Sequence, residues 1–270
     1  MNPSMFGELA IGAYFAAFTA LIWTIHRETG QPRRYCALLS GWLAVILHAL
    51  SLSDFQGHPG VAINLNFLSA LSLVSLLVAT TVLLTSLTRP AEKLGVIAFP
   101  LAAVMLGLKL AIPENIHTVS ERSWPMTLHI LSSLTAYSFL NIAAIQAVLL
   151  AFQDWALRSH HPEGRLVRSL PSLQGMETLL FQLIGAGLIF LTLSLTSGFV
   201  FLDNMFAQHL AHKTVLSILA WLVFAGLMLG RRHFGWRGQM AVRWTLGGFL
   251  SLMLAYFGSK MVLELILGRN

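Results

Sequence analysis

Long uninterrupted runs of apolar residues dominate the hydrophobic pattern of the chain. None of the eight runs shows the strict apolar–polar alternation of a half-buried strand. A helix needs about 20 apolar residues to cross a bilayer, and each run is close to that length or longer. The pattern therefore predicts an all-α fold, a polytopic membrane bundle of about eight transmembrane helices, with residues 1–270 forming a single transmembrane domain. The runs cover residues 7–25, 35–53, 63–87, 94–112, 124–152, 177–202, 212–230 and 239–267.

The composition supports a membrane protein. Charged residues make up 10% of the 270 residues and hydrophobic residues 56%, whereas a soluble domain usually carries about 25% charged residues. So few charges cannot cover a water-facing surface, so we expect the lipid bilayer to be the main partner. We expect a multi-pass protein of a bacterial cytoplasmic (inner) membrane. The N-terminus lacks the pattern of a signal peptide, so the first run should stay in place.

The basic residues predict the orientation of the bundle. Twelve of the 17 Lys and Arg residues lie in or beside four segments: 26–34, 88–93, 153–176 and 231–243. Basic residues concentrate in cytoplasmic loops, so these four segments should face the cytoplasm. Both chain termini then lie on the outer, periplasmic face. This explains the net charge of +6 without a nucleic-acid partner, and none is expected.

Sequence motifs for known catalytic chemistry are missing. The chain has no P-loop, nucleophile elbow, HExxH motif or glycine-rich dinucleotide fingerprint. Its single cysteine, Cys36, allows neither an internal disulfide nor a CxxC motif. The sequence therefore does not assign an enzymatic activity, and a membrane enzyme is not the expected class.

Histidines in the apolar runs are the strongest candidates for a functional site. His48 lies near the outer end of the second run, and His129 lies about one and a half turns into the fifth. His212 begins the seventh run. At about 1.5 Å per residue, the predicted topology places all three in the outer leaflet or at its boundary. We therefore expect His48 and His129 to face the bundle interior, close enough to share one ligand.

Two facing imidazoles suit an axial pair on haem iron. His129 and His48 are accordingly candidate axial ligands of a haem iron, and His212 is a further candidate. A polar side chain inside a span is costly, which favours a functional role. The alternative is that each histidine near the interface only hydrogen-bonds a carbonyl or a headgroup. Trp124, Tyr137 and Phe139 are candidate haem neighbours or ordinary packing residues.

Three segments resemble one family of membrane proteins. The histidine-led helix of the CcsA/ResC-type cytochrome c assembly proteins is similar to residues 129–153, HILSSLTAYSFLNIAAIQAVLLAFQ. Residues 212–238 resemble the helix that follows the tryptophan-rich motif of that family, with Lys213, Trp221 and Arg231 in matching places. Residues 254–266, LAYFGSKMVLELI, match the last helix of the smaller YpjD/HemX-like inner-membrane subfamily. The resemblance extends over essentially the whole chain.

The resemblance implies haem handling at the outer membrane face. Of the haem-contacting histidines of the family, His129 carries over, and His48 fits the second-helix histidine of the subfamily. The tryptophan-rich WGxYWxWDPKE segment is absent, and residues 203–212, DNMFAQHLAH, stand in its place. Two other family histidines are replaced, one by Leu229 and one near Ser259 and Lys260. We therefore expect a haem-binding protein related to cytochrome c biogenesis factors, without the synthase apparatus. With the resemblance, His129 and His48 are the predicted metal ligands, to a b-type haem, and His212 is a further cofactor-binding candidate.

Two other classes of function stay open at this point. An accessory or regulatory subunit that binds another membrane protein without a cofactor explains the missing tryptophan-rich motif equally well. A small-molecule transporter would need polar groups near the middle of the membrane. Asn141 and Gln146 are the amides deep in a span, so this class ranks third.

Overall fold

A computed structural model describes most of the chain, namely residues 3–27, 31–52, 67–88, 91–112, 124–159, 170–201 and 211–255. All regular structure in these residues is helical, as the continuous apolar runs predict. Contacts between the helices group the chain into two compact units. The prediction that residues 1–270 form a single domain is not tested by this grouping and stays a prediction.

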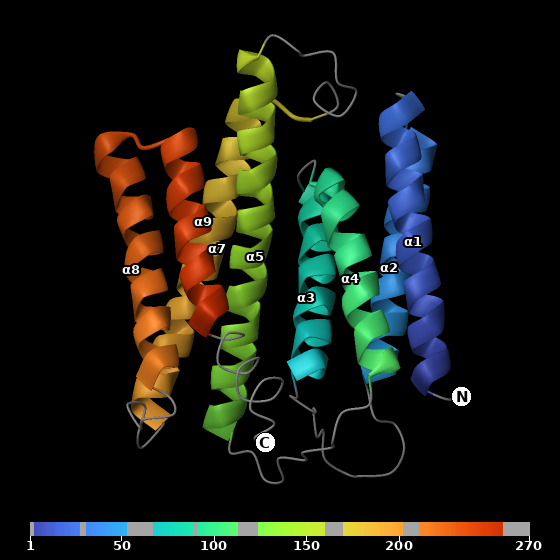
Figure 1. Ribbon diagram of the computed structural model, residues 1–270, viewed down its shortest axis with the longest axis horizontal. Helices are drawn as coiled ribbons and strands as arrows, with labels where there is room; N and C mark the ends of the chain where they lie inside the picture. The colour runs from blue at the N-terminus through green and yellow to red at the C-terminus, as the bar shows by residue number, and fades with distance from the viewer. Residues whose placement is uncertain are drawn as a thin grey trace. The chain divides into compact units, whose positions relative to one another are not determined.

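Among the described residues, each unit contains four long helices (Figure 1). Unit 1 comprises α1 (Pro3–Arg27), α2 (Gln31–Leu52), α3 (Phe67–Thr88), the short 3₁₀ helix η1 (Glu92–Leu94) and α4 (Gly95–Ala111). Unit 2 comprises α5 (Trp124–Arg158), α7 (Leu173–Phe201), α8 (Ala211–Phe234) and α9 (Gln239–Met253).

The predicted membrane spans are confirmed as helices. Within the described residues, seven helices are long and apolar enough to cross a membrane, and they coincide with the first seven apolar runs. The eighth run, 239–267, contains α9, and its residues beyond 255 lie outside the described part. The chain is therefore an all-α polytopic membrane protein.

The predicted loop 153–176 is longer than the connection between α5 and α7 in the structure. Helix α5 continues through residue 158, and α7 begins at residue 173. A helix of 35 residues is about 52 Å long at 1.5 Å per residue, well beyond the ~30 Å hydrocarbon core. Hydropathy marks only the part of a helix inside lipid, so Arg158, predicted in a loop, lies on a helix end.

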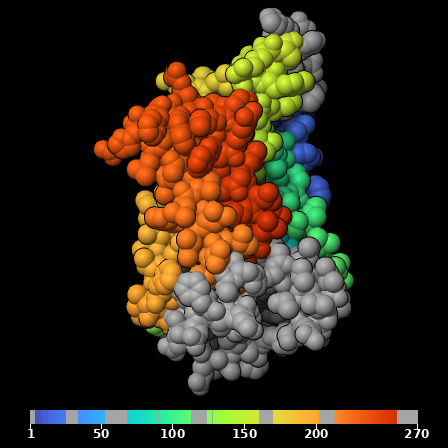
Figure 2. Space-filling model, turned by 60° about the vertical axis from the view of Figure 1, so that its left-hand side comes forward, coloured from blue at the N-terminus to red at the C-terminus, as the bar shows by residue number. Residues whose placement is uncertain are grey.

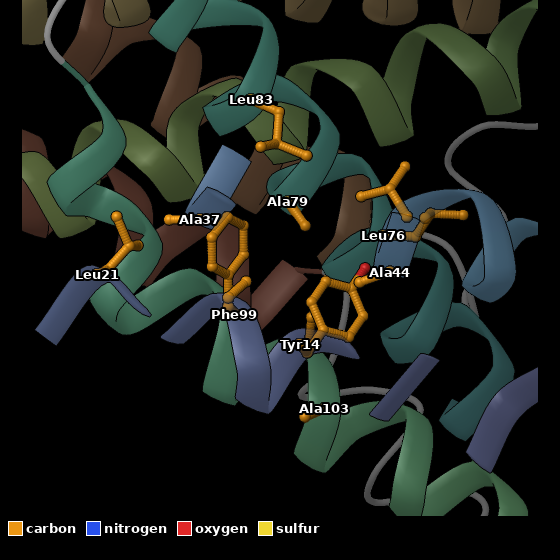
Figure 3. Packing of buried hydrophobic residues seen from close by; sticks show 12 residues of the cluster. Tyr14, Leu21, Ala37, Ala44, Leu76, Ala79, Leu83, Phe99 and Ala103 are labelled. Carbon is orange, nitrogen blue, oxygen red and sulfur yellow. The ribbon is translucent and has the colours of Figure 1, made fainter. Parts of the chain in front are cut away.

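Small residues and a few aromatic rings build the core of unit 1. Tyr14 of α1 and Phe99 of α4 lie 6.0 Å apart between ring centroids, with Leu76 and Leu83 of α3 nearby (Figure 3). Fully or almost fully buried alanines surround them and let the helix backbones approach closely. These alanines are Ala17, Ala37, Ala44, Ala79, Ala102 and Ala103.

Unit 2 is built on the long α5–α7 pair. Gly187 of α7 lies directly under Leu140 of α5, where an added Cβ would come within 2.7 Å of Leu140 Cγ. Helices α8 and α9 form an antiparallel hairpin that packs on this pair (Figure 1). At the hairpin turn, Trp236 covers Gly230 so closely that a Cβ there would overlap the indole ring.

Candidate functional site

His48 is fully buried in unit 1. Its Nδ1 atom lies 3.2 Å from Tyr14 Oη of α1, and its Nε2 atom lies 2.9 Å from Ser72 Oγ of α3. A hydroxyl can donate or accept, so both ring nitrogens are satisfied in either tautomer. The Tyr14 and His48 rings meet edge to face, with centroids 5.8 Å apart. His48 thus joins three helices through one polar network inside an apolar core.

His129 lies in unit 2 and is half-buried between α5 and α7. Its Nδ1 atom lies 2.9 Å from the carbonyl oxygen of Ser194 and 3.3 Å from Ser197 Oγ. A carbonyl oxygen can only accept a hydrogen bond. Nδ1 must therefore carry the proton, and the Nε2 atom of the neutral ring presents its lone pair.

The Nε2 atom of His129 has no hydrogen-bond partner among the residues that the structure describes. Metal-binding histidines commonly donate Nδ1–H to a backbone carbonyl or carboxylate and ligate the metal through Nε2. His129 has this arrangement of donor and lone pair. The geometry therefore fits an axial ligand.

Serines fix the α5–α7 contact around His129. Ser133 Oγ donates to the His129 carbonyl oxygen at 2.6 Å and lies 2.6 Å from Ser194 Oγ. Ser197 Oγ donates to the Ser194 carbonyl at 2.9 Å. These bonds hold the backbone on both sides of the imidazole. The hydropathy pattern did not point to these serines, although they lie at helical spacing on two spans that face each other.

The other predicted site residues differ in their exposure and packing. The backbone of His212 lies at the start of α8, and its side chain is outside the described part of the chain. Trp124 is exposed, as is usual for a residue at a membrane interface. Tyr137 packs on Phe249 and Phe139 stacks on Phe190, with centroids 5.7 and 5.8 Å apart. The latter two aromatic residues therefore contribute to packing within unit 2.

Gln146 has a structural partner. Its side-chain amide is buried and donates to the Met176 carbonyl at 2.9 Å. About two turns further along α5, Gln153 donates to the Pro171 carbonyl at 3.0 Å. Both amides thus bind the start of α7 to α5. A polar group that ties two helices together is a common alternative to a transport site.

No group of three or more His, Cys, Asp or Glu side chains suited to a metal ion occurs in the part of the chain that the structure describes. Haem needs only one or two axial protein ligands, because the porphyrin supplies the other four. A single imidazole such as that of His129 would therefore be enough to hold haem iron. The fold and these side chains define the class as a helical membrane protein with imidazole donors inside its spans.

The sequence comparisons identify the family. The family described as "Cytochrome C assembly protein" matches residues 36–267, so the chain belongs to this family. The inner membrane protein YpjD of Escherichia coli K12 is 33% identical over 265 residues, which cover 97% of this chain and 99% of that protein. No solved structure matches the chain.

Two further relatives place the chain within this family. An uncharacterised 28.8 kDa protein of Azospirillum brasilense is 28% identical over 270 residues, covering 96% of this chain and 97% of that protein. The cytochrome c biogenesis protein CcsA of Chlamydomonas reinhardtii is 25% identical over 190 residues, covering 67% of this chain and 52% of that protein. The resemblance to CcsA-type and YpjD-like proteins is therefore confirmed.

Proposed function

We propose that this protein binds a b-type haem within the membrane and handles haem in a process related to cytochrome c assembly. Family membership supports the process. The single observation that carries the proposal is the hydrogen bond from His129 Nδ1 to the Ser194 carbonyl. That bond fixes the tautomer that leaves Nε2 available as an axial donor.

His48 is the proposed second ligand. Its Nδ1 atom is held by Tyr14 Oη, as that of His129 is held by a carbonyl. Its Nε2 atom contacts Ser72 Oγ. Coordination by His48 requires the serine hydroxyl to give up this bond, so we expect His129 to contribute more to haem affinity. His212, at the start of α8, is the next candidate.

The proposed location is the bacterial inner membrane. The YpjD relative of E. coli is named an inner membrane protein, and it spans nearly the same length. Seven described helices of this chain are suited to a bilayer. A second membrane protein of a haem or cytochrome pathway is the proposed partner, since the chain lacks the tryptophan-rich segment of the full synthases.

The test is the absorbance of the protein purified in mild detergent from haem-replete cells. Two neutral imidazoles give low-spin, six-coordinate iron, so wild type should show that spectrum or acquire it with added haem. His129→Ala should lower haem bound per protein at least about tenfold, because a lost ligand costs no less than a lost outer-shell partner. Added imidazole should restore the band, since it replaces the missing donor.

The matched control is His233→Ala. His233 is exposed at the end of α8, so its removal should leave the band unchanged. Equal loss in both variants, or a wild type that is colourless and binds no added haem, contradicts the proposal. The accessory-subunit hypothesis would then lead, and co-purification with a membrane partner would be the next measurement.

A further inference from the structure

A cavity at one end of unit 2 is separate from both histidines. It has a volume of about 640 Å³ and is walled by the end of α5, the start of α7 and the turn between α8 and α9. These segments lie at the same end of the unit (Figure 1), and Figure 2 shows the α8–α9 hairpin and the end of α5 on the surface. Its charged lining residues are Asp154, Glu177, Arg231 and Arg237.

The two carboxylates of the cavity are already used to fasten its walls. Asp154 accepts hydrogen bonds from Gln239 Nε2 at 2.6 Å and from Arg158 Nε at 3.0 Å. Glu177 Oε1 accepts the backbone N–H of Gly238 at 3.0 Å. These bonds attach the α8–α9 turn to α5 and α7. The two carboxylates equal the two lining arginines in number, but they accept hydrogen bonds from Gln239, Arg158 and Gly238, and no ion pair joins either carboxylate to Arg231 or Arg237 in the described residues.

Arg231 and Arg237 supply the charged hydrogen-bond donors of the cavity lining. The guanidinium of Arg231 lies over the Phe181 ring, 3.8 Å from its centroid. Its Nη1 atom is buried and has no hydrogen-bond partner among the described residues. A buried charged donor without an acceptor is unfavourable, so an acceptor oxygen from a ligand at this position would be stabilising. Arg237 is exposed on the cavity lining, where it can contact the same ligand.

The turn between α8 and α9 forms one wall of the cavity. Gly235 and Gly238 have φ angles of 66° and 61°, a conformation that favours glycine. Trp236 donates its backbone N–H to the Gly230 carbonyl at 3.3 Å, and its ring packs on the Cα of Gly230. The indole ring also lies against Trp244, with centroids 5.0 Å apart. The wall is thus fixed by packing before any ligand arrives.

We propose that this cavity binds a phosphate group through Arg231 and Arg237. The planar fork of an arginine matches the oxygens of a phosphate, and such bonds are among the strongest in proteins. Leu150, Leu173 and Val242 add apolar wall beside these donors, as a phospholipid would require. The cavity also lies at helix ends rich in arginine, where headgroups are found. The phosphate comes either from a phospholipid headgroup or from a soluble phosphate compound.

The test measures binding by delipidated protein in an uncharged maltoside detergent. One arm titrates dioleoyl phosphatidylglycerol in mixed micelles, and the other titrates inorganic phosphate. Wild type should bind at least one of them saturably. Arg231→Gln and Arg237→Gln should each weaken binding about tenfold, the value expected for a hydrogen bond to a charged group. Lipid binding without phosphate binding assigns the headgroup, whereas equal binding of inorganic phosphate assigns the soluble source.

The matched control is Arg232→Gln, which removes the same charge from the next residue. Arg232 is exposed and does not line the cavity, so this variant should bind like wild type. Equal weakening in all three variants means nonspecific attraction by the basic surface and overturns the proposal. Absence of saturable binding in both arms also overturns it. If Arg231→Gln does not fold, Arg237→Gln on the exposed lining decides the outcome, and neither readout depends on haem.

Discussion

At the residue scale, the buried imidazole of His48 depends on two hydroxyls from neighbouring helices. Removing one of them leaves a ring nitrogen without a partner, which costs about 1–3 kcal/mol. Tyr14→Phe and Ser72→Ala should each lower the free energy of unfolding by this amount, measured in detergent by titration with a denaturant. Ser75→Ala is the control, because the Ser75 hydroxyl bonds only the Ser72 carbonyl of its own helix in the described network. Equal loss in Ser75→Ala would contradict this account.

The same variants separate the two nitrogens of His48 in the haem assay. Ser72→Ala frees Nε2, so haem binding should be retained or strengthened although the fold is less stable. Tyr14→Phe removes the partner that orients Nδ1, and loss of such an outer-shell bond should weaken haem binding about 10-fold or more. Absorbance titration with haem checks both results. Weaker binding in Ser72→Ala than in Tyr14→Phe would show that His48 does not ligate through Nε2.

The sequence revealed the histidines but not their partners. A histidine within an apolar run can be recognised from the sequence alone, because it is a polar residue in a hydrophobic segment. Tyr14, Ser72 and Ser194 contact these rings because of how neighbouring helices are rotated about their axes. That rotation depends on the packing of whole faces, which no single run encodes. The sequence therefore could not predict that His129 Nδ1 bonds the Ser194 carbonyl and leaves Nε2 as the lone-pair donor.

At the element scale, the α5–α7 pair depends on one glycine. A Cβ at Gly187 would lie 2.7 Å from both Cγ and Cδ2 of Leu140. Gly187→Ala must therefore push α7 away from α5, and overpacking of this kind costs about 1–3 kcal/mol. Unfolding in detergent should show the loss, and adding Leu140→Ala should recover part of it. Because His129 donates across this same pair of helices, haem binding should weaken as well.

Gly12→Ala in α1 is the control for this prediction. A Cβ at Gly12 meets no atom within 4 Å, and alanine is the better helix former by up to about 1 kcal/mol. Gly12→Ala should therefore be neutral or slightly stabilising. A destabilisation equal to that of Gly187→Ala would mean that the contact with Leu140 is not the cause.

The elements themselves were predictable, and their ends were not. Lipid requires every span to be apolar and to satisfy its backbone internally, so runs of about 20 apolar residues specify helices. Outside the hydrocarbon core that requirement ends, and α5 extends to Arg158 through polar residues. The cavity of unit 2 lies among such ends. One wall of this cavity is the turn at Gly235 and Gly238, and a hydropathy pattern cannot predict the shape of a turn.

At the scale of the whole molecule, the basic segments of each unit gather at one end. In unit 1, Arg34 lies at the start of α2, and its Nε atom is 3.6 Å from Glu92 Oε1. Its Nη2 atom donates to the Ser86 carbonyl at the end of α3. In unit 2, the bonds of Asp154 and Glu177 bring the α8–α9 turn to the end of α5 and the start of α7. Within each unit, the segments predicted to be cytoplasmic therefore share one side.

The predicted orientation follows from this clustering and from the positive-inside rule. Twelve of the 17 basic residues belong to the segments predicted to be cytoplasmic, and the eight predicted spans would return the chain to its starting side. A phosphatase fused after Asn270 should therefore be active in the periplasm, and a fluorescent protein fused there should be dark. Fusion after Ser159, just beyond α5, should give the reverse pattern and serves as the internal control. Fluorescence at Asn270 together with phosphatase activity at Ser159 would invert the molecule, and His129 would then face the cytoplasmic half of the membrane.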